Sequence, residues 1–168
     1  LDASVYQQRS VTIVEIMGRN AGWLVGAAAL SKGEDCDGPD LIYVPELPFD
    51  IDNFLVRIKE LLAEKTFVVV AVSEGIRLAD GRYVCELTDG VDFVDAFGHK
   101  QLTGTANYLA RRLAQEIGCK TRTIELSSMQ RAASHLASRI DILEAFQVGG
   151  AAVKAADEGD TGEMVIIK

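Results

Sequence analysis

The sequence lacks the long apolar runs that mark membrane proteins. Its longest apolar stretches, residues 66–73 and 21–30, fall well short of the roughly 18 residues that a membrane-spanning helix needs. No basic segment followed by an apolar one opens the chain, so we also expect no secretory leader. These absences predict a soluble protein.

Cysteine and histidine are also scarce. The three cysteines, Cys36, Cys85 and Cys119, are widely spaced and odd in number, which fits neither a disulfide framework nor a metal-ligand cluster. A reducing, cytoplasmic location is the simplest expectation. His99 and His135 lack the neighbouring residues that zinc sites and catalytic triads need, so we interpret both as structural or surface residues.

Basic residues are too few for a nucleic-acid-binding surface. The chain has 17 Lys and Arg against 25 Asp and Glu, which gives a net charge of −8. Neutralising a phosphate backbone requires a clustered excess of positive charge, so we expect no nucleic-acid partner. Local basic sites for a small anion remain open.

The remaining composition is that of one globular domain over residues 1–168. Hydrophobic residues make up 48% of the chain and charged residues 25%, which suits a chain with its own core. The first residue is Leu1 instead of Met, and residues 1–8 carry no start signal of their own. A truncated chain, with part of its chemistry missing, is therefore one interpretation.

Short β-branched runs alternate with longer helical patterns, which predicts an α/β fold. We expect a mostly parallel sheet with helices on both faces, and an excursion or short hairpin over residues 77–96. The expected strands cover residues 11–16, 41–44, 67–72, 122–126 and 164–167. The expected helices cover residues 20–31, 51–64, 99–117, 131–139 and 142–156.

In open sheets of this kind, ligands collect beyond the carboxyl ends of the strands. The first such end carries Met17, Gly18, Arg19 and Asn20, where glycine permits close approach and arginine offers a forked donor for phosphate. Asn20 is a candidate N-cap of the following helix. The alternative is an ordinary strand-to-helix turn with a solvated arginine.

Two other predicted strand ends carry polar residues. Glu74 can accept hydrogen bonds from sugar hydroxyls or bind a cation, although a turn carboxylate is an equal alternative. Gln130 and Arg131 could donate to an oxyanion, although Arg131 could instead pair with a surface carboxylate. Because three strand ends offer such residues, we predict one pocket for a phosphate and hydroxyl groups.

Four segments of the sequence resemble phosphofructokinases. Residues 14–23, VEIMGRNAGW, resemble the VE-x-MGR-x-AG stretch of that family, and residues 122–131 resemble its R-x(3)-L-x(3)-QR segment. Residues 45–49 and 69–75 resemble two further strand ends of the family, in family order. The sequences of residues 98–102, GHKQL, and residues 11–23, VTIVEIMGRNAGW, are most similar to the pyrophosphate-dependent or related bacterial long-chain members.

The resemblance implies a glycolytic enzyme part that binds fructose 6-phosphate, whose 1-hydroxyl receives a phosphoryl group. It implies that Met17 and Gly18 contact the sugar and that Arg19 is catalytic, reaching toward the transferring phosphoryl group. By the same resemblance, Glu74 accepts hydrogen bonds from sugar hydroxyls and Arg131 contacts the sugar phosphate.

The resemblance also implies residues that act across a subunit boundary. Arg122 and Arg9 would reach the 6-phosphate bound by a neighbouring subunit, so we expect a homo-oligomer. Ser128 stands where relatives often have His or Tyr, and its hydroxyl would donate to the phosphate.

The sequence has no Gly-Gly-Asp loop for the phosphoryl donor and no Thr-Ile-Asp-x-Asp segment for the catalytic base and Mg²⁺. We expect a donor-binding lobe upstream of this chain, using pyrophosphate or ATP, with the Mg²⁺ ligands in that lobe. One lobe alone should then be inactive, because phosphoryl transfer needs groups on both sides of the bond. The alternative is a non-catalytic, sugar-phosphate-binding or regulatory module.

Overall fold

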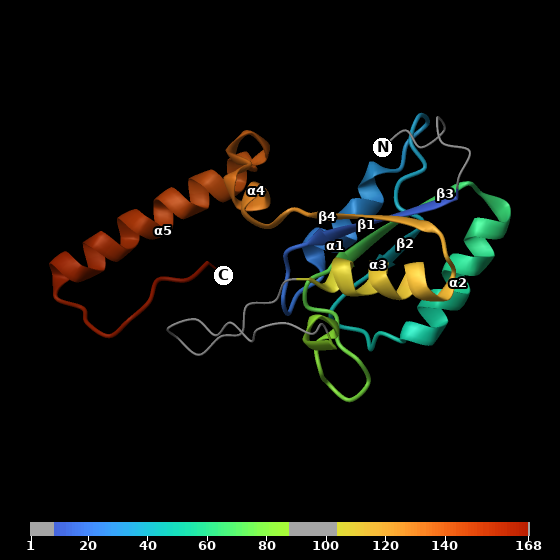
Figure 1. Cartoon of the computed structure of the whole chain (residues 1–168). Helices are drawn as coiled ribbons and strands as arrows, with labels where there is room; N and C mark the ends of the chain where they lie inside the picture. The colour runs from blue at the N-terminus through green and yellow to red at the C-terminus, as the bar shows by residue number, and fades with distance from the viewer. Residues whose placement is uncertain (1–8, 88–103, 168) are drawn as a thin grey trace. The chain divides into compact units, whose positions relative to one another are not determined.

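The computed structural model describes residues 9–87 and 104–167, and it divides into two compact units, Leu1–Gln130 and Arg131–Lys168 (Figure 1). The first unit holds a parallel sheet and its helices. The second unit consists mainly of one long helix. The assignment of residues 1–168 to a single domain stays a prediction.

The sheet of the first unit has four strands, namely β1 (Ser10–Ile16), β2 (Leu41–Tyr43), β3 (Phe67–Ser73) and β4 (Lys120–Glu125). Their order is β2-β3-β1-β4, and every neighbouring pair is parallel. The predicted α/β fold with a parallel sheet is confirmed. Because all strands run the same way, the residues that follow β1, β3 and β4 lie at one edge of the sheet.

One face of the sheet carries the main core. Val11 pairs with Val68 and Ile13 with Val70, so these side chains share a face. That face is covered by α2 (Ile51–Glu64) and α3 (Thr105–Glu116), which contribute Phe54, Leu55, Ile58, Leu62, Ala106, Leu109, Ala110 and Leu113 to the same cluster. Each large apolar side chain buried in this way contributes roughly 1.5–3 kcal/mol.

The helix α2 begins where the sequence predicts it, because Asp50 caps it. The Oδ1 atom of Asp50 accepts a hydrogen bond from the amide of Asn53 at 3.0 Å. Such a cap satisfies an amide that the first helical turn leaves without a partner, and losing it costs about 1 kcal/mol. The helix then forms most of the connection between β2 and β3.

The opposite face of the sheet is covered by α1 (Trp23–Gly26) and the 3₁₀ helix η1 (Ala27–Ser31) (Figure 1). The connection from β1 to β2 runs in the opposite direction to those that follow β2 and β3. Right-handed crossovers therefore place α1 on one face and α2 and α3 on the other. Helices on both faces were predicted, and the structure confirms them.

The predicted helix over residues 20–31 is wrong in its start and its type. The cap position belongs to Gly22, whose amide donates to Oε1 of Glu46 at 2.6 Å. Asn20 is not an N-cap, because its Oδ1 atom instead accepts from Arg77 at 2.8 Å. A glycine at position 26 lowers helix propensity, and the segment continues as a 3₁₀ helix.

The excursion after β3 is present in its described part. Arg77 forms isolated bridges with Pro48 and Tyr83, and the amide of Leu78 donates to the carbonyl of Arg82 at 2.9 Å. The 3₁₀ helix η2 (Val84–Leu87) follows. The remainder of the predicted excursion, residues 88–96, and the first five residues of the predicted helix over 99–117 lie outside the described residues.

The boundary between the two units falls within α4 (Ser127–Ala132). The second unit then contains the 3₁₀ helix η3 (Ser134–Leu136) and α5 (Arg139–Glu158). Ser138 caps α5 through bonds from the amides of Ile140 and Asp141, so the single helix predicted over residues 131–139 is wrong. The predicted helix over residues 142–156 lies within α5.

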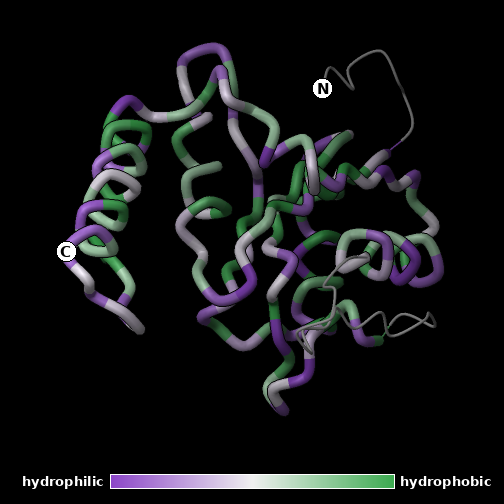
Figure 2. Tube along the Cα trace, turned by 90° about the vertical axis from the view of Figure 1, so that its left-hand side faces the viewer, coloured by the Kyte–Doolittle hydropathy of each residue, from purple (hydrophilic) through white to green (hydrophobic). Residues whose placement is uncertain are grey.

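The helix α5 carries hydrophobic residues along its whole length (Figure 2), and none of its residues is buried. Its large exposed apolar side chains are Ile140, Ile142, Leu143, Phe146 and Val153. The predicted closing strand over residues 164–167 is wrong, because these residues form no ladder with any described strand. An apolar, β-branched pattern needs a neighbouring strand for its hydrogen bonds. No helix in the described ranges is both long and apolar enough to cross a membrane.

Candidate functional site

The turn after β1 is bound by side chains from two other strand ends. The amide of Met17 donates to Oε1 of Gln130 at 2.9 Å, and the amide of Gly18 donates to Oε1 of Glu74 at 3.3 Å. Gln130 lies on α4 just after β4, and Glu74 directly follows β3. The segments that were predicted to converge therefore meet at the carboxyl edge of the sheet.

The end of β3 makes a second contact with the same turn. The hydroxyl of Ser73 donates to the carbonyl oxygen of Gly18 at 2.6 Å and accepts from the amide of Gly75 at 3.0 Å. Ser73 is completely buried. Sequence reasoning did not select Ser73, and its only signal is a hydroxyl at the end of a strand that is otherwise apolar.

Two glycines are required for this close approach. A Cβ atom on Gly75 would lie 1.9 Å from the carbonyl oxygen of Arg19, which is far inside contact distance. Gly18 has a φ of 148°, and a Cβ there would lie 2.7 Å from the carbonyl oxygen of Ala21. Only glycine fits both positions without moving the backbone.

The predicted catalytic residue, Arg19, follows Gly18 and is half-buried. A second arginine that the sequence analysis did not select lies at the same edge. The Nη2 atom of Arg77 donates to Oδ1 of Asn20 at 2.8 Å and to the hydroxyl of Tyr83 at 2.6 Å. Its guanidinium also lies 4.4 Å from the centre of the Tyr83 ring. These contacts hold the residue after Arg19 in place.

A buried carboxyl group lies just behind the turn. Glu15 is 5% exposed, and its Oε2 atom accepts from the amide of Ala106 at 2.7 Å, at the start of α3. The pKa of Glu15 is raised to about 7, mainly by burial; the nearby carboxylates of Glu125 and Glu74 contribute to this rise, and the bond from Ala106 opposes it. The hydroxyl of Thr105 donates to the carbonyl of Glu74 at 3.2 Å, so α3 also contacts this edge.

The other predicted site residues lie elsewhere on the chain. Arg122 is exposed on β4 and pairs with Thr12, while Arg9 is exposed just before β1. Arg9 is thus at the amino end of β1, and the strand separates it from Met17 by roughly 3.3 Å per residue. Within one chain the structure does not bring Arg9 to the turn after β1.

Ser128 and Arg131 lie on α4, and both are exposed. Ser128 shares that short helix with Gln130, which contacts Met17. Arg131 is the first residue of the second unit, which is described by itself. The structure thus brings together Met17, Gly18 and Glu74, with Arg19 and Ser128 next to them in sequence or on the same helix.

The described residues contain no group of three or more His, Cys, Asp or Glu that could hold a metal ion. The Mg²⁺ that the family resemblance implies therefore has no fitting ligand set in residues 9–87 and 104–167. We assign no chemical step of these residues to a metal.

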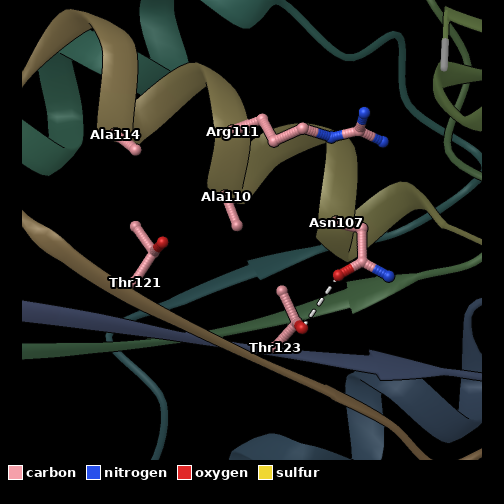
Figure 3. Close-up of a pocket in the computed structure, with 6 residues that line it drawn as sticks. All are labelled: Asn107, Ala110, Arg111, Ala114, Thr121 and Thr123. Atoms are coloured by element: carbon pink, nitrogen blue, oxygen red, sulfur yellow. Dashed lines mark hydrogen bonds between the residues drawn. The ribbon is translucent and has the colours of Figure 1, made fainter. Parts of the chain in front are cut away.

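A separate groove lies between α3 and β4 (Figure 3). The hydroxyl of Thr123 donates to Oδ1 of Asn107 at 2.9 Å across it. Its lining residues are Asn107, Ala110, Arg111, Ala114, Thr121 and Thr123. None of the predicted site residues lines this groove, so it is distinct from the turns at the strand ends.

Comparison with known proteins identifies the family that this chain is similar to. The phosphofructokinase family model matches residues 1–156. A pyrophosphate–fructose 6-phosphate 1-phosphotransferase from Halomonas elongata is 39% identical over 158 residues, which cover 94% of this chain and 37% of that protein. An ATP-dependent 6-phosphofructokinase 2 from Streptomyces coelicolor is 30% identical over 169 residues, which cover 100% of this chain and 46% of that protein.

A solved structure of a phosphofructokinase has a similar fold. The pyrophosphate-dependent phosphofructokinase from Marinobacter aquaeolei matches with a TM-score of 0.66 and 31% identity, over 92% of this chain and 34% of that chain. The chain thus spans between 34% and 46% of the length of these three relatives. Because the family match covers nearly the whole sequence, including every strand of the described residues, the chain belongs to the phosphofructokinase family.

Proposed function

We propose that this chain is the fructose 6-phosphate-binding part of a glycolytic phosphofructokinase. The complete enzyme would transfer a phosphoryl group from pyrophosphate or ATP to the 1-hydroxyl of the sugar. The observation that carries this proposal is the meeting of three strand ends at Gly18 and Met17, through Glu74 and Gln130. It places polar groups from separate elements around one small region.

Each residue of this region has a proposed role. The backbone of Met17 and Gly18 lies against the sugar, and the carboxylate of Glu74 accepts hydrogen bonds from its hydroxyl groups. The Oε1 atom of this carboxylate already accepts from Gly18, and its other oxygen selects a ligand with donors, because an apolar ligand would leave that oxygen desolvated and unpaired. Arg131 and the Ser128 hydroxyl bind the 6-phosphate.

Arg19 is the proposed catalytic residue. Phosphoryl transfer passes through a state in which negative charge spreads over the transferring group. A guanidinium stabilises that charge, and the stabilisation is largest when the group is fixed beforehand. The bonds around Gly18 support this role, because they fix the backbone to which Arg19 is attached.

Arg122 and Arg9 are proposed to serve the neighbouring subunit of a homo-oligomer. Both are exposed, and Arg9 lies at the far end of β1 from the turn that carries Arg19. Because Arg9 lies at the end of β1 away from Arg19, it could contact a 6-phosphate at this site only from a neighbouring subunit. The working enzyme would then be at least a dimer.

The donor, the catalytic base and the Mg²⁺ ligands are proposed to belong to a part of the enzyme outside these 168 residues. The chain spans about 37% of the length of its Halomonas relative, and its described residues provide no metal-binding group. We therefore expect the isolated chain to bind fructose 6-phosphate weakly and to catalyse no transfer.

A coupled assay tests this proposal. The complete enzyme, meaning this chain joined to its donor-binding part, should form fructose 1,6-bisphosphate with pyrophosphate or with ATP, and each donor is supplied separately. The isolated chain should form none. Calorimetric titration of the isolated chain with fructose 6-phosphate should show binding that Glu74→Ala weakens. Absence of product with both donors in the complete enzyme would contradict the proposal.

A further inference from the structure

Three consecutive residues at the end of β3, residues 73–75, contact two consecutive residues after β1, Gly18 and Arg19. The Ser73 hydroxyl binds the carbonyl of Gly18, the Glu74 carboxylate binds the amide of Gly18, and Gly75 lies against the backbone of Arg19. The two peptide units on either side of Gly18 are therefore both tied to β3. The bond to Ser73, at 2.6 Å, is the shorter of the two side-chain bonds.

The peptide that Ser73 holds is the one that joins Gly18 to Arg19. Its carbonyl oxygen accepts a hydrogen bond from the Ser73 hydroxyl. This bond fixes the orientation of the peptide plane that precedes Arg19. Gly18 has a φ of 148°, and glycine has little conformational preference of its own, so its neighbours must restrict it. The Ser73 hydroxyl supplies that restriction.

The Ser73 hydroxyl both donates and accepts a hydrogen bond, and it is completely buried. It donates to Gly18 and accepts from the amide of Gly75, and its residue is 0% exposed. Removing the hydroxyl would leave a buried amide and a part-buried carbonyl without this partner. Small movements of the turn would then cost little free energy, because no other described contact from β3 binds the carbonyl of Gly18.

We propose that Ser73 is a positioning residue for phosphoryl transfer, and that it sets the place of the Arg19 guanidinium by fixing the Gly18–Arg19 peptide to the end of β3. This inference rests on the function proposed above. Ser73 is completely buried, and its hydroxyl binds backbone atoms of Gly18 and Gly75. Its effect passes through Arg19, whose misplacement by about an ångström is enough to lower a rate substantially.

Three variants of the complete enzyme test the proposal. Ser73→Ala removes the hydroxyl and should lower kcat at least about tenfold, while the KM for fructose 6-phosphate changes less than about threefold, since Arg19 acts mainly in the transition state. Ser73→Thr keeps the hydroxyl and should restore kcat to within about threefold of wild type. Equal kinetic constants for Ser73→Ala and wild type would overturn the proposal.

Ser10→Ala is the matched control, because Ser10 is a serine that is also buried, at the opposite end of the sheet. Both alanine variants should lower the melting temperature, but only Ser73→Ala should lower kcat. A purely structural role would lower kcat in neither variant or in both alike, and either result would overturn the proposal.

Amide exchange in the isolated chain separates this inference from the proposed function. In Ser73→Ala, the Gly75 amide loses its acceptor and should exchange at least about tenfold faster, whereas Ser73→Thr should keep its protection. An unchanged rate would overturn the proposed role of the Ser73 hydroxyl, whether or not the enzyme is active. If the exchange rate rises but the wild-type complete enzyme forms no product with either donor, the proposed function fails, and the catalytic role of Ser73 is overturned with it.

Discussion

Gly75 lies so close to Arg19 that a Cβ atom on the glycine would be 1.9 Å from the carbonyl oxygen of the arginine. The two residues are 56 positions apart in the sequence and belong to the turns after β3 and β1. Their contact shows that the two turns pack backbone against backbone. A side chain at position 75 would separate them.

Gly75→Ala should therefore lower both stability and activity. The added methyl group forces the backbone of Arg19 to move, and overpacking of this kind costs about 1–3 kcal/mol. The displacement of Arg19 should reduce kcat of the complete enzyme by at least about tenfold. Urea unfolding and the coupled assay provide the two measurements.

Gly26→Ala is the control for this substitution. No atom lies within 4 Å of the place where its Cβ would stand, and it ends the helix α1. Alanine should leave kcat unchanged there and keep or slightly raise stability, by up to about 1 kcal/mol. If Gly75→Ala were as harmless as Gly26→Ala, the close packing of the two turns would be refuted.

The buried carboxyl of Glu15 predicts a specific pH dependence of stability. Burial raises its pKa from 4.5 to about 7 in the folded chain. Between these values the folded state holds a proton that the unfolded state has lost, so this contribution to stability is complete below pH 4.5. It falls as the pH rises toward 7 and is lost above that value, by about 3 kcal/mol in total.

Glu15→Gln removes this titration and keeps an oxygen that can accept from Ala106. The stability of the variant relative to wild type should therefore increase between pH 5 and pH 8, by up to about 3 kcal/mol. Urea unfolding at the two pH values measures the difference. Glu34→Gln, at an exposed position, should show no such increase. A constant difference between Glu15→Gln and wild type would contradict the prediction.

The strands and the convergence of their ends could be predicted because they rest on local patterns. Apolar, β-branched runs identify β1, β2 and β3, and the rule on strand ends selects Gly18 and Glu74, which the structure joins. Ser73 and Gly75 instead contact residues that are 55 or more positions away in the sequence. No pattern within one segment reveals such a contact.

The errors in helix and strand assignment have the same origin. The Asn20 side chain was expected to cap a helix but binds Arg77, a residue 57 positions away. Residues 164–167 have the composition of a strand, but the described part of the chain gives them no partner. In both cases a distant contact, or its absence, outweighs local propensity.

The three cysteines should differ in reactivity at pH 8. The thiolate is the reactive form, and burial raises the pKa of Cys85 to about 11, with the carboxylates of Glu15 and Glu86 adding to the shift. Burial also raises the pKa of Cys119, while Cys36 is exposed. Labelling with iodoacetamide, followed by peptide mass spectrometry, should proceed in the order Cys36, Cys119, Cys85. In denaturant the three rates should become similar, and a Cys85 that reacts first in the folded chain would contradict its burial.

Arg122→Ala in the complete enzyme tests the proposed interface. The variant should raise the KM for fructose 6-phosphate more than it lowers kcat, because the residue is proposed to bind the 6-phosphate and not the transferring group. Arg111→Ala, which removes the same charge from an exposed position on α3, should leave both constants unchanged. An unchanged KM in Arg122→Ala would place Arg122 outside the pocket.

Mixing two variants that are each poorly active at low sugar concentration decides whether Arg122 acts within its own subunit or across the interface. In a dimer of Arg122→Ala with Arg19→Ala, a site shared between subunits combines Arg19 from the first chain with Arg122 from the second. Random mixing makes half of the dimers hybrid, and each hybrid has one intact site of two, so about a quarter of wild-type activity should return at low sugar concentration. If both arginines served their own subunit, every site would lack one of them, and mixing would give no more activity than the two variants have separately.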